Sequence, residues 1–185
     1  MDRAAMHDLV AGRERALDEL MSRHAAPIHQ FLLRMVHQEE TAADLAQETF
    51  VRIFTHADKY DPAQRFTTWL YTIASNLARD FLRAQTRRPT VSLNATTGEE
   101  ELTLGDLQVD PGPLAPDVMI GEEQRLRVRA AVAALPDDLR EAIVLCELEN
   151  LSLAEASEIL QSTVKAIESR LYRARKLLRK VLLPA

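Results

Sequence analysis

Residues 152–175, SLAEASEILQSTVKAIESRLYRAR, predict two helices joined by a short polar turn. Ser152 and Glu155 have the spacing of a capping box, in which two side chains satisfy free backbone N–H groups at the start of a helix. Thr163 can cap a second, longer helix after the turn. Residues 165–180 carry seven basic side chains against one acidic side chain. A short helix followed closely by a strongly basic helix is typical of a helix-turn-helix unit.

The second helix of this unit has an outer face suited to base recognition. We expect its apolar residues to face inward: Val164, Ile167, Leu171 and Ala174. The residues left on or beside the outer face are Lys165, Glu168, Ser169, Arg170 and Arg173. Arginine binds guanine in a bidentate manner, glutamate accepts a hydrogen bond from cytosine, and serine can donate to a base edge or accept from one. This pattern predicts a helix that enters the major groove of DNA, and a solvated basic helix is the alternative.

A second candidate for nucleic-acid contact is the helix predicted over residues 67–88. Its apolar side consists of Trp69, Leu70, Ile73, Leu77, Phe81 and Leu82. Asn76, Arg79 and Arg83 are spaced so that they share another face, which Arg87 extends. An amide with several guanidinium groups suits an unstacked base and its flanking phosphates.

The segment before this helix predicts a loop over residues 60–65, because Pro62 disfavours helical geometry in the residue before it. The nearby aromatic residues are open to two interpretations. Tyr60, Phe66 and Trp69 can stack on bases, or the last two can belong to the core. For Trp69, core packing is the favoured interpretation.

The residues before that loop predict further amphipathic helices. Pro27 suits the first turn of a helix, where its missing N–H costs nothing. Thr41 suits an N-cap, since it places Asp44 in the first turn. We expect the apolar residues of the helix after Thr41 to face inward: Leu45, Phe50, Ile53 and Phe54.

Charge is sorted along the chain. The formal net charge of the 185 residues is −5. Residues 89–121 hold six acidic residues without Lys or Arg, four of the eight prolines and four of the five glycines. This composition is typical of a linker. We therefore predict an all-α protein of two small helical domains, 1–88 and 122–185, joined by the acidic linker 89–121.

The sequence argues against an enzyme. The five histidines are scattered singly, and the lone Cys146 can form neither an internal disulfide nor a multi-cysteine zinc site. No nucleotide-binding glycine motif is present, so we expect no catalytic residues, metal or cofactor. No apolar run reaches the roughly 20 residues needed to span a bilayer, and the N-terminus lacks the pattern of a signal peptide. We expect a cytoplasmic protein without membrane insertion.

Four segments together carry a resemblance to a known family. Residues 44–50 (DLAQETF) and 66–76 (FTTWLYTIASN) closely resemble region 2 of the extracytoplasmic-function sigma factors of bacterial RNA polymerase. Residues 133–142 and 152–175 resemble region 4 of the same family. The sequence departs from the family at Gln161, where glycine is frequent, and at Glu168, where a basic residue is frequent.

The resemblance implies a role for each candidate residue. Those implied to dock on the clamp helices of the polymerase beta-prime subunit are Asp44, Gln47 and Glu48. Those implied to capture a flipped base of the −10 element and hold its backbone are Tyr60, Asp61, Gln64, Arg65, Asn76, Arg79, Arg83, Arg87 and Arg88. Those implied to read the −35 element as duplex are Lys165, Glu168, Ser169, Arg170 and Arg173.

The partners implied by the resemblance are core RNA polymerase, including its beta flap, promoter DNA and an anti-sigma factor. The acidic linker is implied to thread the polymerase cleft. Two other functions stay open at this point. One is a sigma-like decoy that titrates an anti-sigma factor without initiating transcription. The other is an ordinary repressor or activator that uses only the helix-turn-helix, which would leave residues 44–76 without a purpose.

Overall fold

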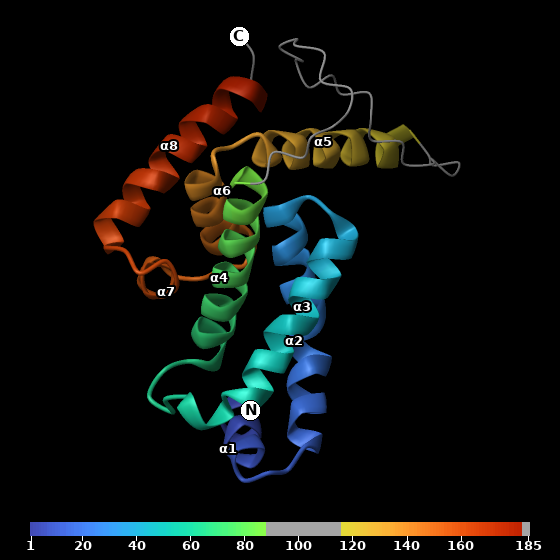
Figure 1. Ribbon diagram of the computed structural model, residues 1–185. Coiled ribbons are helices and arrows are strands. Elements are labelled where there is room, and N and C mark those ends of the chain that lie inside the picture. The colour runs from blue at the N-terminus through green and yellow to red at the C-terminus, as the bar shows by residue number, and fades with distance from the viewer. Residues whose placement is uncertain (88–115, 183–185) are drawn as a thin grey trace.

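The computed structural model describes residues 1–87 and 116–182, and every regular element in these two ranges is a helix (Figure 1). The predicted all-α class with two small helical domains is therefore confirmed. Most of the predicted acidic linker and Arg88 lie outside the described residues.

The first half is a bundle built on two long helices. Its elements are α1 (Asp2–Val10), α2 (Arg15–Val36), α3 (Glu39–Thr55), the 3-10 turn η1 (Ala57–Lys59) and α4 (Phe66–Arg87). The helices α2 and α3 pack against each other, and α4 packs on both. The core between them contains fully buried side chains from each, among them Phe31, Ile53 and Leu70. Burying such residues removes apolar surface from water and stabilises the bundle.

The second half contains the predicted helix-turn-helix. Its elements are α5 (Pro116–Ala133), α6 (Asp137–Ile143), the π-helical turn η2 (Val144–Leu148), α7 (Leu153–Ile159) and α8 (Val164–Leu182). The capping box is confirmed, since the Glu155 N–H donates to Ser152 Oγ at 3.2 Å and the Ser152 N–H donates to the Glu155 carboxylate at 2.9 Å. Thr163 accepts from the Ala166 N–H at 3.2 Å, which confirms the second cap.

Two predicted helix starts are wrong. Pro27 lies in the middle of α2, because the apolar face of that helix continues through it from Leu20 to Ile28, both fully buried. Packing of this continuous face outweighs the lost hydrogen bond. Thr41 is not an N-cap, because α3 begins at Glu39. Two acidic residues in that first turn favour the earlier start through the helix dipole.

Two residues expected to face inward are exposed. Phe54 is 46% exposed near the end of α3, and Val164 is 41% exposed at the start of α8. Each lies in a terminal turn, where the neighbouring helix no longer covers the full apolar width. The other inward residues of α8, namely Ile167, Leu171 and Ala174, are buried as predicted.

The two halves pack against each other, with α4 contacting α7 and the end of α2 contacting α6 (Figure 1). Arg140 of α6 lies at this junction with only 5% exposure. Its guanidinium donates to the carbonyl oxygens of Ala133 at 2.9 Å and Leu135 at 3.1 Å, and it pairs with Asp137. It also donates to the carbonyl oxygen of Met35, at the end of α2, at 3.3 Å. One buried cation therefore joins elements of both halves.

The turn between α7 and α8 stores backbone strain. Gln161 adopts the left-handed region with φ 47°, which costs a residue with a Cβ roughly 1–2 kcal/mol. Replacing Gln161 with glycine removes this cost. The greater conformational entropy of the unfolded chain, however, lowers the free energy of unfolding by roughly 0.4–1 kcal/mol. We expect Gln161→Gly to stabilise the protein by about 0.5–1 kcal/mol and to raise Tm by about 1–4 °C in calorimetry.

A matched control is Asn150→Gly, at φ 55°. Because asparagine tolerates the left-handed region through local hydrogen bonding, this change should raise Tm less than Gln161→Gly does. An equal or larger gain at Asn150 would contradict the strain at Gln161.

Candidate nucleic-acid interface

The loop before α4 has a fixed shape. The Tyr60 hydroxyl donates to the Gln64 carbonyl oxygen at 2.8 Å, and the Ala63 N–H donates to Asp61 Oδ1 at 2.8 Å. These two hydrogen bonds close the loop from inside, as in an Asx-turn. Asp61 and Arg65 are exposed, so the loop presents polar groups on a rigid backbone.

The aromatic residues near this loop pack on one another. Tyr60 and Phe66 are 8% and 3% exposed, and Trp69 is partly buried. The ring centroids of Tyr60 and Trp69 lie 5.2 Å apart, and the Phe66 and Trp69 centroids lie 6.4 Å apart. In this structure the rings of Tyr60 and Phe66 therefore belong to the core and position the loop, which favours core packing over base stacking for both.

Asn76 and Arg79 form the centre of a polar face on α4. Arg79 Nη2 donates to Asn76 Oδ1 at 2.8 Å, which orients the exposed amide. Arg83 lies one turn farther along with Asp80 Oδ1 at 3.6 Å, and Arg87 is exposed near the end of the helix. With a rise of 1.5 Å per residue, this face extends about 16 Å from Asn76 to Arg87.

The outer face of α8 is exposed as predicted. Lys165, Glu168 and Ser169 are exposed, and Arg170 is partly buried. Arg170 Nε and Arg173 Nη2 lie 3.9 Å and 3.8 Å from Asp138 Oδ2. This carboxylate orients two of the five candidate side chains toward α6. The capped start of α8 and its ordered turn give the face a defined position relative to the rest of the helix-turn-helix.

The exposed face of α3 combines charge with apolar surface. Asp44 and Gln47 are exposed, and Glu48 accepts from Arg52 Nε at 2.8 Å. Sequence reasoning missed two apolar residues on the same side of the helix. Val51 and Phe54 are 47% and 46% exposed, and they follow Asp44 at helical spacing. Val51, an apolar residue two helical turns after Asp44, was the feature of the sequence that could have indicated this surface. An exposed apolar strip with a polar rim is typical of a protein-binding surface.

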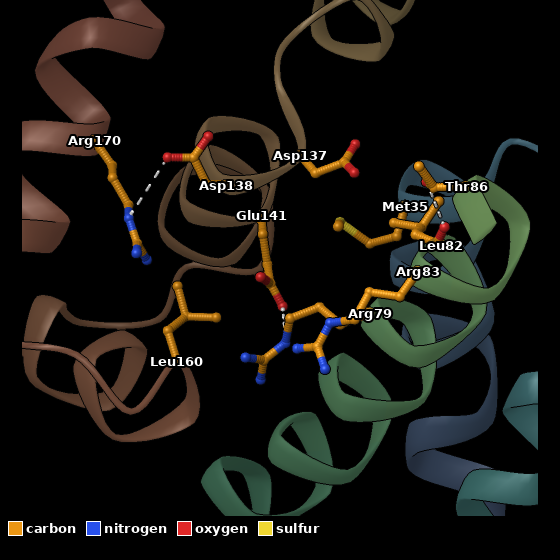
Figure 2. Close-up of a pocket in the computed structure, with 10 residues that line it drawn as sticks. All are labelled: Met35, Arg79, Leu82, Arg83, Thr86, Asp137, Asp138, Glu141, Leu160 and Arg170. Atoms are coloured by element: carbon orange, nitrogen blue, oxygen red, sulfur yellow. Dashed lines mark hydrogen bonds and ion pairs between the residues drawn. The ribbon is translucent and has the colours of Figure 1, made fainter.

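A cavity of about 270 Å³ lies between the halves, and arginines from both candidate DNA-binding helices line it. Figure 2 shows Arg79 of α4 beside Glu141 and Arg170 of α8 beside Asp138, with Arg83 and Asp137 also lining the cavity. Arg79 Nε lies 3.5 Å from Glu141 Oε1, whose side chain is 6% exposed. Burial raises the pKa of Glu141, although the charge of Arg79 opposes the shift. The structure thus brings both sets of arginines to one acidic cluster.

Within residues 1–87 and 116–182, no group of three or more His, Cys, Asp or Glu side chains is arranged to hold a metal ion. No helix in the described part of the chain combines the length and apolar character needed to cross a membrane. Cys146 is half-buried in the core edge, where burial raises the pKa of its thiol.

Comparisons with known proteins match both halves. The model of sigma-70 region 2 matches residues 20–88, and that of sigma-70 region 4 matches residues 125–178. The ECF RNA polymerase sigma factor SigW of Bacillus subtilis is 35% identical over 172 residues, which are 92% of this chain and 91% of SigW. The RNA polymerase sigma-H factor of Pseudomonas aeruginosa is 32% identical over 99% of this chain and 94% of its own.

Solved structures agree in fold. The structure of CnrH in complex with the cytosolic domain of CnrY has a TM-score of 0.71 at 28% identity and covers 98% of this chain and 96% of CnrH. The sigma factor RpoE in complex with the anti-sigma factor NepR from Bartonella quintana has a TM-score of 0.68 at 21% identity, covering 91% and 98%. Given these full-length relatives and both region matches, the chain belongs to the extracytoplasmic-function family of RNA polymerase sigma factors.

Proposed function

We propose that this sigma factor docks on core RNA polymerase through α3 and directs initiation at promoters whose −10 and −35 elements it contacts through α4 and α8. The observation that carries the proposal is that each half of the chain has one polar helix face. Each has the side-chain chemistry of its task, and each lies within a match to a sigma-70 region. As a sigma factor, the protein is an initiation factor and not an enzyme.

The α4 face and its loop fit capture of an extruded base. Extrusion costs a few kcal/mol of unstacking, which a preformed site must offset. The loop 60–65 is held by its own hydrogen bonds, and Asn76 is oriented by Arg79, so little further ordering is needed on binding. Arg79, Arg83 and Arg87 extend from the amide along the helix, where they would meet successive phosphates.

The α8 face fits duplex DNA. Ser169, Arg170 and Arg173 provide donors for base edges in the major groove, and Lys165 lies near the start of the helix. Glu168 repels phosphate but accepts from the amino group of cytosine, so it contributes base selection rather than affinity. Arg170 and Arg173 must leave Asp138 in order to reach bases.

The α3 face fits a protein partner. Asp44, Gln47 and Glu48 provide a charged and polar rim, while Val51 and Phe54 supply apolar area to be buried. We assign this face to the clamp helices of the beta-prime subunit and region 4 to the beta flap. Structural relatives are known with the cytosolic domain of CnrY and with the anti-sigma factor NepR. We infer that an anti-sigma factor also regulates this chain. The decoy function gains no support from any contact among the described residues.

The proposal is tested by run-off transcription with core RNA polymerase and a genomic promoter library, with and without the protein. Discrete start sites that depend on the protein are expected, and their alignment yields both promoter elements. Transcription that does not change on addition of the protein would contradict the proposal.

We predict that Asn76→Ala slows promoter opening at least about tenfold, because a hydrogen bond to the extruded base is lost while the unstacking cost stays. Permanganate footprinting measures the opening. Affinity for core polymerase should stay unchanged. The matched control is Gln85→Ala, an exposed residue on the opposite side of α4, which should open promoters normally. Equal loss of polymerase affinity in Asn76→Ala would refute the assignment.

Charge reversal on α3 should have the opposite effect. We predict that Asp44→Lys or Glu48→Lys weakens binding to core polymerase about tenfold or more, since like charges then meet across the interface. Fluorescence titration of core polymerase measures the affinity. The control is Glu39→Lys, about 140° around the same helix from Asp44. If Glu39→Lys weakens binding as much as the two test variants do, the docking face has been misplaced.

A further inference from the structure

Three glutamates of the second half each meet an arginine of the first half. We name this set, Glu141, Glu149 and Glu155, the glutamate latch. Glu149 Oε1 accepts from Arg34 Nη1 at 2.6 Å, and Glu149 Oε2 accepts from the Tyr71 hydroxyl at 2.6 Å.

The other two latch residues meet α4 and the loop before it. Glu141 Oε1 lies 3.5 Å from Arg79 Nε, and Glu155 Oε1 accepts from Arg65 Nη1 at 2.5 Å. The latch therefore runs along one side of the first half, from the loop before α4 to α2.

The latch carboxylates are shielded from water. The side chains of Glu141, Glu149 and Glu155 are 6%, 8% and 14% exposed. A carboxylate removed from water needs a positive or hydrogen-bonding partner, and a buried one left without a partner is strongly destabilising. For Glu149 both partners come from the other half of the chain. The latch thus depends on the two halves staying together.

Two arginines held by the latch are ones that the proposed function assigns to DNA. Arg65 and Arg79 are assigned to the −10 surface. Glu155 accepts a hydrogen bond from Arg65, and Glu141 forms a looser ion pair with Arg79 at 3.5 Å. A carboxylate and a phosphate compete for the same fork of N–H donors. Figure 2 shows the guanidinium groups of Arg79 and Arg83 near the carboxylate of Glu141, at the cavity that both halves line. Acidic side chains of the second half therefore pair with two arginines that are assigned to promoter phosphates.

The packed arrangement also fails to span a promoter. Elements centred about 10 and 35 base pairs before the start site are about 25 base pairs apart, or roughly 85 Å at 3.4 Å per base pair. Arg79 and Arg170, assigned to the two elements, line one cavity of about 270 Å³. The two halves must separate before both elements can be contacted on one duplex.

We propose that the free protein is closed on itself by the glutamate latch, and that the latch competes with promoter DNA for the arginines of region 2. The identity of the masked surface rests on the proposed function. The closure itself rests only on the contacts between the halves. Binding of polymerase or promoter opens the protein by offering these arginines and the interface other partners.

The first test is small-angle X-ray scattering of the full chain. The wild type should give a radius of gyration of about 16 Å, as for a compact chain of 185 residues. Glu149→Lys places an ammonium group against Arg34 and should raise the radius by roughly a quarter as the halves separate. Far-UV circular dichroism checks that both halves keep their helices.

The matched control is Glu147→Lys, which makes the same change of charge two residues away. Glu147 pairs with Arg175 of its own half, so this variant should stay compact. The charge-swapped double variant Arg34→Glu with Glu149→Lys restores an ion pair and should return the radius to the wild-type value. Arg34→Glu alone, at a more exposed side chain, should open the protein as Glu149→Lys does.

The second readout is binding to a fluorescent single-stranded oligonucleotide of mixed sequence, followed by anisotropy. Apparent affinity scales with the fraction of open molecules. Glu149→Lys should therefore bind at least about threefold tighter than Glu147→Lys, which carries the same net charge. An extended wild type, or a Glu149→Lys variant as compact as the control, would overturn the latch. If the wild type is compact and Glu149→Lys is extended, but the two variants bind DNA equally, the latch stands and the masking is overturned. Failed transcription with an intact latch would count against the proposed function alone.

Discussion

The arrangement of this protein depends on one buried cation. Arg140 sits at the corner where α5, α6 and the end of α2 meet. Its two Nη atoms donate to three carbonyl oxygens and to Asp137, while its buried Nε has no hydrogen-bond partner among the described residues. A buried guanidinium without these partners would cost several kcal/mol, so the corner cannot loosen on one side alone. Burial, followed by the charge of Arg140, lowers the pKa of His37, which ends α2 in the left-handed conformation. His37 therefore adds no competing positive charge there at neutral pH.

Around this corner the interface combines apolar and polar contacts. The buried apolar cluster runs through both halves, and ion pairs and a tyrosine hydrogen bond also join them. Burial and the hydrogen bond to Glu149 raise the pKa of Tyr71, so its hydroxyl stays a donor. Polar interfaces of this kind specify one arrangement but separate at modest cost, because each charged group regains water on opening. This combination suits the proposed change from a compact free protein to an extended one on a promoter.

The neighbours of the latch residue Glu155 likewise stabilise its charged form. Burial by itself raises the pKa of Glu155, but the hydrogen bonds from Ser152 and the charge of Arg65 outweigh it and lower the pKa. The same side chain therefore caps α7 and accepts a hydrogen bond from Arg65, at the end of the loop 60–65 in the other half. Glu155 thus couples the start of α7 to the surface proposed to capture the flipped base, because it makes hydrogen bonds with both Ser152 and Arg65.

The sequence by itself determined the all-α class, the capping box at Ser152, the cap at Thr163 and the exposed face of α8, because these features follow from local spacing and backbone chemistry. It also placed Asn76 and Arg79 on one face, since helical periodicity needs no tertiary information. Only the tertiary structure decided that Pro27 lies within a helix and that Phe54 is exposed, because burial depends on which neighbour covers each turn. The latch was equally invisible to local pattern. Arg34 and Glu149 are 115 residues apart, and only packing of the two halves brings their charges together.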